Sequence, residues 1–249
     1  MKSWFVSDIH LKNIEERNSQ ILLRFLYDIT QDAKNNQLFL LGDIFDFWVA
    51  DGDAFYQHYK LIVDAITYFK ESGGLVYYFE GNHDFHIDTF WTKKFQIPVY
   101  ADTFMFNIDH LKVRIEHGDF INPDDTKYLE YRSTIRQSSV KTLAHILPSF
   151  FVKWLGDFLS SKSRKKSKDY AIKNQLEIKN MIRKYARHCF SNEKFDLIIT
   201  GHMHVQDDHI FKDLQMRSIN LGTWLNQPIA LKIENGKIEW KDLSVQTKN

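Results

Sequence analysis

The chain has 249 residues, of which 43% are hydrophobic and 26% are charged, so it is long enough for one large domain or two small ones and is not a disordered chain. Its 33 basic and 32 acidic side chains give a formal charge of only +1, so binding to nucleic acid or membrane would have to come from a local patch. The single cysteine, the absence of a signal-peptide pattern and the lack of a long apolar run exclude a disulfide scaffold and lead us to expect a cytoplasmic chain whose membrane contact is peripheral.

Short runs of strand-forming residues alternate with helical periods along most of the chain, which is typical of an α/β fold. Helices are predicted around residues 21–29 and 61–69, where apolar residues recur on one face, and Gly73 and Gly74 end the second helix. Near the C-terminus, Asn235 and Gly236 form a strong hairpin signal, so the sheets are expected to finish antiparallel. The predicted strands are 3–6, 37–41, 75–79, 113–116, 197–200, 216–221, 229–233 and 237–240.

Residues 122–188 break this alternation with continuous helical periods, which predicts a helical insertion between two parts of a core, 1–121 and 189–249. The segment 151–188 carries eleven Lys or Arg and three Asp or Glu, a net charge of +8, which leaves −7 for the remainder. A basic run, residues 160–173 with a net charge of +5, next to an aromatic stripe fits an acyl-chain groove at an anionic membrane surface; core packing of the stripe and a solvated charged face for the run are the alternatives. The stripe is Phe150, Phe151, Trp154, Leu155, Phe158 and Leu159.

Five short motifs stand where predicted strands end, and they contain five of the eleven histidines and four of the ten glycines. The carboxyl ends of strands in α/β sheets form binding sites, so these side chains are expected to converge, and the glycines let the backbone turn sharply beside them. Each motif alone also fits a helix cap or a buried histidine, but five together indicate one site. The motifs are Asp8-Ile9-His10, Gly42-Asp43, Gly81-Asn82-His83-Asp84, His117-Gly118-Asp119 and Gly201-His202-Met203-His204.

The side chains in these motifs are carboxylates, an amide and imidazoles without a thiolate, which suits divalent metals such as Mn, Fe or Zn. Seven such donors are too many for one tetrahedral ion, but they suit two ions that share a bridging carboxylate and keep positions open for water and substrate. Two close ions can generate hydroxide at neutral pH and neutralise phosphoryl oxygens. The sequence therefore predicts a dinuclear metal hydrolase of phosphoesters.

The ordered set of motifs from Asp8 to His204 resembles the calcineurin-like metallophosphoesterases. The resemblance implies a four-layer α-β-β-α sandwich and two divalent ions, for which we expect Mn²⁺ with Fe or Zn as alternatives. It also implies that His83 contacts the scissile phosphate or the leaving group and that Asp84 orients it, the alternative for His83 being a support behind the ligands. The implied ligands are Asp8, His10, Asp43 and His204 for the first ion and Asp43, Asn82, His117 and His202 for the second, with Asp43 as the bridge.

The flanking residues are similar to a narrower family, the UDP-2,3-diacylglucosamine pyrophosphatases of lipid A biosynthesis, in segments 42–53, 117–136 and 147–148. That resemblance implies cleavage of a lipid-linked nucleotide to UMP and 2,3-diacylglucosamine 1-phosphate, an insertion that caps the site, and a location on the cytoplasmic face of the inner membrane. The chain departs from that family at His83, where its members carry Arg. The implied substrate-binding residues are Asn82, Asp125, Arg132, Ser161, Lys165 and Lys168.

Three other functions are compatible with parts of this pattern. A hydrolase with the same mechanism would act on another nucleotide, phosphodiester or phosphoprotein. An inert scaffold is disfavoured because none of the seven expected ligands is missing. A nuclease fits the metals and the basic run, but charge on one helical stretch is a poor footprint for a nucleic-acid groove, so no nucleic-acid partner is expected.

Overall fold

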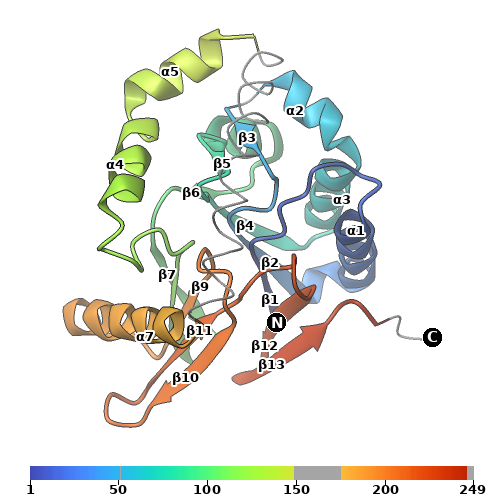
Figure 1. Ribbon diagram of the computed structural model, residues 1–249. Coiled ribbons are helices and arrows are strands. Elements are labelled where there is room, and N and C mark those ends of the chain that lie inside the picture. The colour runs from blue at the N-terminus through green and yellow to red at the C-terminus, as the bar shows by residue number, and fades with distance from the viewer. Residues whose placement is uncertain (51, 149–174, 246–249) are drawn as a thin grey trace.

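Two β-sheets form the centre of the molecule (Figure 1). The structure, a computed structural model, describes residues 1–50, 52–148 and 175–245. The six-stranded sheet has the order β13-β12-β1-β2-β4-β6, and the five-stranded sheet has the order β10-β11-β9-β8-β7. Their strands are β1 (Lys2–Val6), β2 (Asn36–Leu41), β4 (Leu75–Phe79), β6 (Val99–Tyr100), β7 (Phe104–Ile108), β8 (Leu111–Ile115), β9 (Leu197–Thr200), β10 (Asp207–Phe211), β11 (Met216–Asn220), β12 (Ile229–Glu234) and β13 (Lys237–Asp242).

The strands that carry the motifs are parallel within each sheet. β1, β2 and β4 pair in parallel in the first sheet, and β8 and β9 pair in parallel in the second, because helical crossovers connect them. Parallel neighbours end at the same edge of a sheet, so the loops after these five strands can meet. The predicted hairpin β12–β13 is confirmed, with positive φ at both Asn235 and Gly236. The crossover helices of the first sheet are α1 (Arg17–Thr30), α2 (Asp53–His58) and α3 (Lys60–Glu71).

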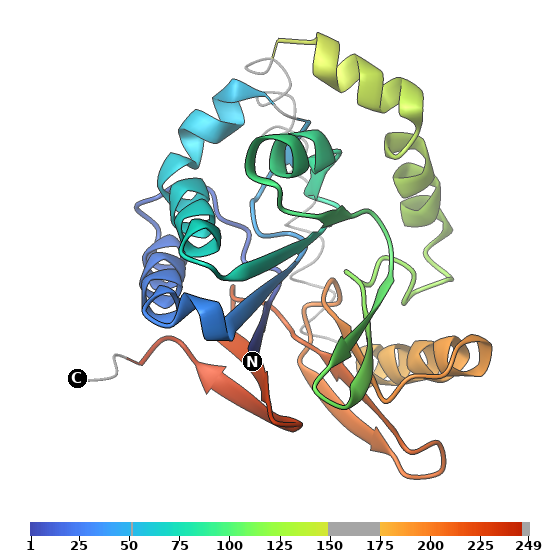
Figure 2. The same cartoon turned by 180° about the vertical axis from the view of Figure 1, so that it is seen from behind.

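Apolar residues alternate along the strands, and this alternation builds four layers. Phe5 and Phe39 stack at 4.6 Å in the core between the two sheets. The other face of the first sheet packs on α1 and α3, and the outer face of the second sheet packs on α7 (Gln175–Asn192) through Ala186 and Cys189. Both views show α1 and α3 on one side of the molecule and α7 on the other (Figures 1 and 2). The predicted α-β-β-α arrangement is therefore confirmed.

The described part of the chain between β8 and β9 is helical. It contains α4 (Thr126–Ile135), α5 (Ser138–Ile146) and α7, which continues past residue 188 into the outer helical layer. Neither α4 nor α5 has a fully buried residue, and the two helices pack on the apolar core through partly buried residues such as Ile135 and Ala144. The aromatic stripe and the basic run lie outside the described residues. Among the helices that are described, none is long and apolar enough to cross a membrane.

Four small elements complete the path of the chain. β3 and β5 form a two-stranded parallel pair beside the first sheet, which places the segment after Asp43 next to the segment after Asn82. These elements are η1 (Ala33–Asn35), β3 (Trp48–Val49), β5 (Asp84–Phe85) and η2 (Thr89–Lys94).

Candidate metal centre

Five loops, which follow β1, β2, β4, β8 and β9, meet between the carboxyl edges of the two sheets. Backbone hydrogen bonds join them: the amide of Asp8 donates to the carbonyl of Gly42 at 3.1 Å, and the amide of Gly201 donates to the carbonyl of His117 at 2.7 Å. The amide of His202 donates to the carboxylate of Asp8 at 3.0 Å, which connects the second sheet to the first. These contacts bring all seven predicted ligand residues to one place.

Four of these residues form a group that we call the first half-site: Asp8, His10, Asp43 and His204, whose ligand atoms all lie within 4.8 Å of one another. The Nε2 atoms of His10 and His204 are 3.1 Å apart, and His204 Nε2 is 3.2 Å from Asp8 Oδ1. Ligands about 2.0–2.2 Å from a common ion are separated by distances of this size. A divalent ion therefore fits between these side chains.

Four residues form the second half-site: Asp43, Asn82, His117 and His202. The amide oxygen of Asn82 is 3.2 Å from His117 Nε2 and 3.0 Å from His202 Nδ1. Asp43 belongs to both groups, because its Oδ1 is 3.7 Å from His117 Nε2 and its Oδ2 is 3.8 Å from His10 Nε2. One carboxylate thus presents one oxygen to each half-site, which is the geometry that a bridging ligand requires.

The backbone at the ligands is itself in an unusual conformation. Five of the seven ligand residues have φ between 51° and 67°, a region that non-glycine residues seldom adopt. Such conformations cost on the order of 1–3 kcal/mol each and cluster at functional sites, where the surrounding structure maintains them. The chain therefore turns sharply at the strand ends largely at the ligand residues themselves. These are Asp8, His10, Asp43, His202 and His204.

The glycines of the motifs have two different roles. Gly42 has φ +76°, as expected for a residue that lets the chain turn. Gly81 and Gly201 have no positive φ, and their role is close approach: a Cβ at Gly81 would collide with the carboxylate of Asp43, and one at Gly201 would collide with that of Asp8. The missing side chains leave space for the two carboxylates.

The charge balance of the cluster also fits a cation. His117 donates from Nδ1 to the carbonyl of Leu41 at 2.7 Å, so its Nε2 faces the oxygens of the second half-site. Burial alone would lower the pKa of His117, but the carboxylates of Asp43, Asp119 and Asp8 raise it to about 9. Burial lowers the pKa of His10 to about 3, which keeps that ring in the neutral form that binds metals. The carboxylates stabilise the protonated, positively charged form of His117. A divalent ion bound beside them would supply this positive charge in place of the proton.

The family model for calcineurin-like phosphoesterases matches residues 1–206. The chain belongs to this family. A relative from Vibrio vulnificus (strain YJ016) with the name UDP-2,3-diacylglucosamine hydrolase is 29% identical over 237 residues, 94% of each chain. A relative of the same name from Proteus mirabilis (strain HI4320) is 27% identical over 242 residues, 96% of this chain and 98% of its own. The solved structure of an archaeal phosphodiesterase is 14% identical, with a TM-score of 0.49 over 97% of this chain and 98% of its own.

Family membership and the hydrolase relatives identify the chain as a metallophosphoesterase, an enzyme that uses divalent metal ions. His83, the predicted catalytic residue of this phosphoesterase, is half-buried beside His10, with the two ring centroids 4.8 Å apart. Its Nδ1 donates to the carbonyl of Asp46 at 2.6 Å, which leaves Nε2 for other partners. The ring therefore lies at the margin of the first half-site, and Asp46 holds its orientation.

Asp84, the expected orienting partner of His83, has different contacts in the phosphoesterase structure. Its buried carboxylate accepts hydrogen bonds from the backbone amides of Asp43 and Ile44 at 2.8 Å and from the hydroxyl of Tyr78 at 2.6 Å. Burial and the nearby charge of Asp43 raise the pKa of Asp84 to about 7, against these donors. Asp84 thus holds the backbone that carries the bridging carboxylate, and Asp46 takes the contact with His83 that was expected of Asp84.

The predicted substrate-binding residues fall into three groups. Asn82 lies in the second half-site, and Asp125 caps the N-terminus of α4 by accepting from the amide of Tyr128 at 3.1 Å. Arg132 donates from Nε to Asp119 at 2.7 Å and from Nη2 to Asp102 at 2.8 Å, so two carboxylates hold its guanidinium. The other three, Ser161, Lys165 and Lys168, lie outside the described residues.

Two contact residues of the site had no role in the sequence interpretation. Asp119 was recognised only as part of the His-Gly-Asp motif, yet its buried carboxylate lies 3.9 Å from His202 Nδ1 and accepts from Tyr128 and Arg132. Glu80 pairs with Arg136 directly before the glycine of the Gly-Asn-His-Asp motif. Asp119 and Glu80 lie in or next to the predicted motifs, but no periodic pattern in the sequence indicates their partners, Arg132 and Arg136.

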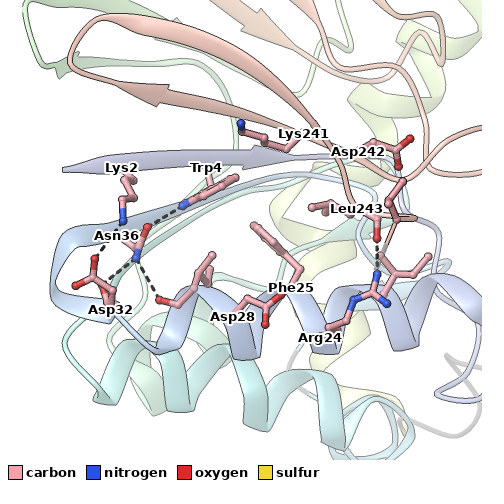
Figure 3. A pocket seen from close by; sticks show the side chains of 13 residues that line it. Lys2, Trp4, Arg24, Phe25, Asp28, Asp32, Asn36, Lys241, Asp242 and Leu243 are labelled. Carbon is pink, nitrogen blue, oxygen red and sulfur yellow. Dashed lines mark hydrogen bonds and ion pairs between the residues drawn. The ribbon is translucent and has the colours of Figure 1, made fainter. Parts of the chain in front are cut away.

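A separate cavity of about 280 Å³ lies between α1 and the strands β1 and β13 (Figure 3). Lys2 pairs with Asp32 at 3.2 Å there, and the indole of Trp4 donates to Asn36 at 2.8 Å beside the ring of Phe25. The ring contact joins β1 to α1, and Asn36 at the start of β2 donates from Nδ2 to the carbonyl of Ile29 in α1 at 3.2 Å. The polar groups of this cavity therefore hold two layers of the phosphoesterase fold together.

Proposed function

We propose that this phosphoesterase hydrolyses the diphosphate of UDP-2,3-diacylglucosamine to UMP and 2,3-diacylglucosamine 1-phosphate, with two Mn²⁺ ions, or Fe or Zn in their place. The observation that carries the proposal is the extent of the match to relatives with that hydrolase name, 92–98% of both chains. A match of this extent includes most of the region between β8 and β9, where an insertion would distinguish one phosphoesterase from another.

The seven ligand residues would hold both ions, with Asp43 shared between them. Two bound ions would lower the pKa of water and neutralise phosphoryl oxygens during its attack on phosphorus. The amide of Asn82 lies in the second half-site, where it can also orient the phosphate. When both of its ring nitrogens carry protons, the half-buried imidazole of His83 would donate from Nε2 to a phosphoryl oxygen or to the leaving group, while Nδ1 donates to the carbonyl of Asp46.

The lipid part of the substrate would be bound by the insertion 122–188, including the aromatic residues around Trp154. The net charge of +8 in residues 151–188 would place this side of the molecule against an anionic membrane, which we propose to be the cytoplasmic face of the inner membrane. The remainder, with net charge −7, would be repelled by the same surface. Binding would therefore be peripheral and oriented.

The test is incubation of the purified protein with Mn²⁺ and UDP-2,3-diacylglucosamine, followed by detection of UMP. A preparation treated with EDTA and an Asp43→Asn variant are the controls, and neither should release UMP. If UMP does not appear while bis(p-nitrophenyl) phosphate is hydrolysed, the enzyme is a phosphoesterase and the lipid nucleotide is not its substrate.

The second candidate is a phosphoesterase with the same metal centre that acts on another nucleotide, phosphodiester or phosphoprotein. Two observations favour it. His83 stands where the lipid A family carries Arg, and the guanidinium of Arg132 is already paired with Asp119 and Asp102. An inert scaffold is disfavoured because the structure gathers the complete set of seven ligand residues.

A further inference from the structure

Two arginines one turn apart, Arg132 in α4 and Arg136 at the C-cap of this helix, lie on the face that meets the core. Residues four apart lie above one another on a helix, so the two guanidinium groups leave α4 in the same direction. Both are largely buried, with side-chain exposures of 12% and 13%. Each contacts a loop that supplies a ligand residue to the second half-site.

Arg132 contacts the loop that follows β8. It donates from Nε to Asp119 Oδ2 at 2.7 Å, and Tyr128, also on α4, donates its hydroxyl to Asp119 Oδ1. Asp119 comes two residues after His117, and its Oδ1 is 3.9 Å from His202 Nδ1. The ring of Tyr128 also lies 5.0 Å from that of His202. Two side chains of α4 thus hold a carboxylate that faces the second half-site.

Arg136 contacts the loop that follows β4. It donates from Nη2 to the carbonyl of Gly81 at 2.9 Å, and its Nη1 pairs with Glu80. The other oxygen of Glu80 accepts from the amide of Ile87 at 2.9 Å, which fixes the far end of the same loop. Gly81 immediately precedes Asn82, so Arg136 acts on the position of the amide oxygen that faces His117 and His202.

The first half-site is held in another way. The carbonyl of Asp8 accepts from the amide of Trp224 at 3.1 Å and from the hydroxyl of Thr223 at 2.9 Å, both in the loop between β11 and β12. In the ranges that the structure describes, no hydrogen bond or ion pair links α4 to residues 8–10, 203 or 204. The direct contacts of α4 therefore reach the loops that supply Asn82 and His117, and the bridging Asp43, whose Oδ1 accepts from the amide of His83 at 2.8 Å, is reached only through the loop after β4.

We propose that Arg132 and Arg136 are positioning residues of the second half-site, so that the docking of α4 and the binding of the second ion are energetically coupled. By linkage, an ion that binds better with α4 docked also stabilises the docked helix. The helix has no fully buried residue and packs on the apolar core through the partly buried Ile135, so these ionic contacts add to a small apolar attachment. The proposal rests on the two-ion site and is independent of the identity of the substrate.

The experiment is a Mn²⁺ titration of the metal-free protein, with bound metal counted after equilibrium dialysis and the spin coupling between two ions followed by electron paramagnetic resonance. Arg132→Met and Arg136→Met should each lower the affinity for the second ion by about 10–100-fold, because loss of a residue that positions a metal ligand typically costs that much affinity. The affinity for the first ion should stay within threefold of the parental value. At one equivalent bound, the spectrum should be that of isolated Mn²⁺. Arg132→Lys and Arg136→Lys retain the charge and should restore part of the affinity.

Lys141→Met is the matched control. Lys141 lies on α5 and pairs with Asp88 at 2.7 Å across the same interface, but Asp88 is not in a loop that supplies a ligand. This variant should bind both ions as the parent does. Two ions bound with parental affinity in both Met variants, or an equal loss of both ions in variants with native circular dichroism, would overturn the proposal. If a Met variant does not fold, the corresponding Lys variant decides by the same criteria.

Discussion

Gly81→Ala tests whether the space beside Asp43 is required for the metal centre. Gly81 has no positive φ, so alanine can adopt its backbone conformation, and only the new contact is unfavourable. The added Cβ would lie 2.5 Å from the amide nitrogen of Asp43 and 2.9 Å from Asp84 Oδ1, and it would also collide with the carboxylate of Asp43. The perturbation therefore falls directly on the bridging residue.

The size of the effect follows from these distances. Relief of the contact with the Asp43 amide to 3.0 Å requires a shift of about 0.5 Å, whereas metal sites tolerate deviations of about 0.2 Å in ligand distance. Misplacement of a reacting group by about 1 Å costs on the order of 10²-fold in rate, so we expect a loss of about that size. Overpacking should cost about 1–3 kcal/mol in the free energy of unfolding, which a folded domain survives.

The assay compares kcat on bis(p-nitrophenyl) phosphate, bound Mn²⁺ and urea unfolding on one preparation. Gly73→Ala is the matched control, because Gly73 has φ +104° and its added Cβ would meet only the flexible side chain of Lys34. It should lose a similar amount of stability through backbone strain and keep parental activity. If Gly81→Ala has parental kcat and metal content, the close approach of Gly81 to Asp43 is not needed and the reasoning is refuted.

Three further predictions concern the remaining parts of the account. His83→Ala should lose roughly 10²–10⁴ in rate with unchanged metal content, and loss of metal would make His83 a ligand or a support. Because His117 has a pKa of about 9 without metal and must release its proton to bind an ion, the apparent affinity for the second ion should rise about tenfold per pH unit from pH 7 to 9, with about one proton released in calorimetry; a flat profile would contradict this. Replacement of Lys162, Arg164, Lys165 and Lys166 by Gln should release the protein from anionic vesicles at moderate salt, while hydrolysis of the soluble diester is unchanged.

The fold and the convergence of the seven candidate ligand residues could be predicted because their signals are local. Residues such as Phe5 and Phe39 alternate along predicted strands, and each ligand motif directly follows one. Short or weakly patterned elements were missed: β6 has only two residues, and no strand was predicted for β7 or β10. Leu61, the first residue of the apolar pattern that predicts the helix at 61–69, is 56% exposed, because the buried face is formed by residues such as Ile62 and Val63.

The contacts that support the ligands could not be predicted, because they join residues without a repeating separation. Arg132 reaches Asp119 across 13 positions, and Arg136 reaches Glu80 across 56. No sequence periodicity indicates such pairs. Which acidic residue each arginine contacts is decided only when α4 packs on the core. The substitution of Asp46 for Asp84 as the partner of His83 has the same origin, since the backbone amides that occupy Asp84 belong to a loop 40 positions earlier.

The bridging role of Asp43 is the centre of the account, and Asp43→Asn tests it most directly. The amide keeps the size of the side chain and removes the charge that both half-sites share. Metal content and turnover of bis(p-nitrophenyl) phosphate are measured on the same folded preparation. We predict fewer than two ions per chain and a loss of activity of about 10³-fold or more, since the interactions of both ions would depend on this carboxylate. Two ions bound per chain with near-parental turnover would remove Asp43 from the centre and contradict the account.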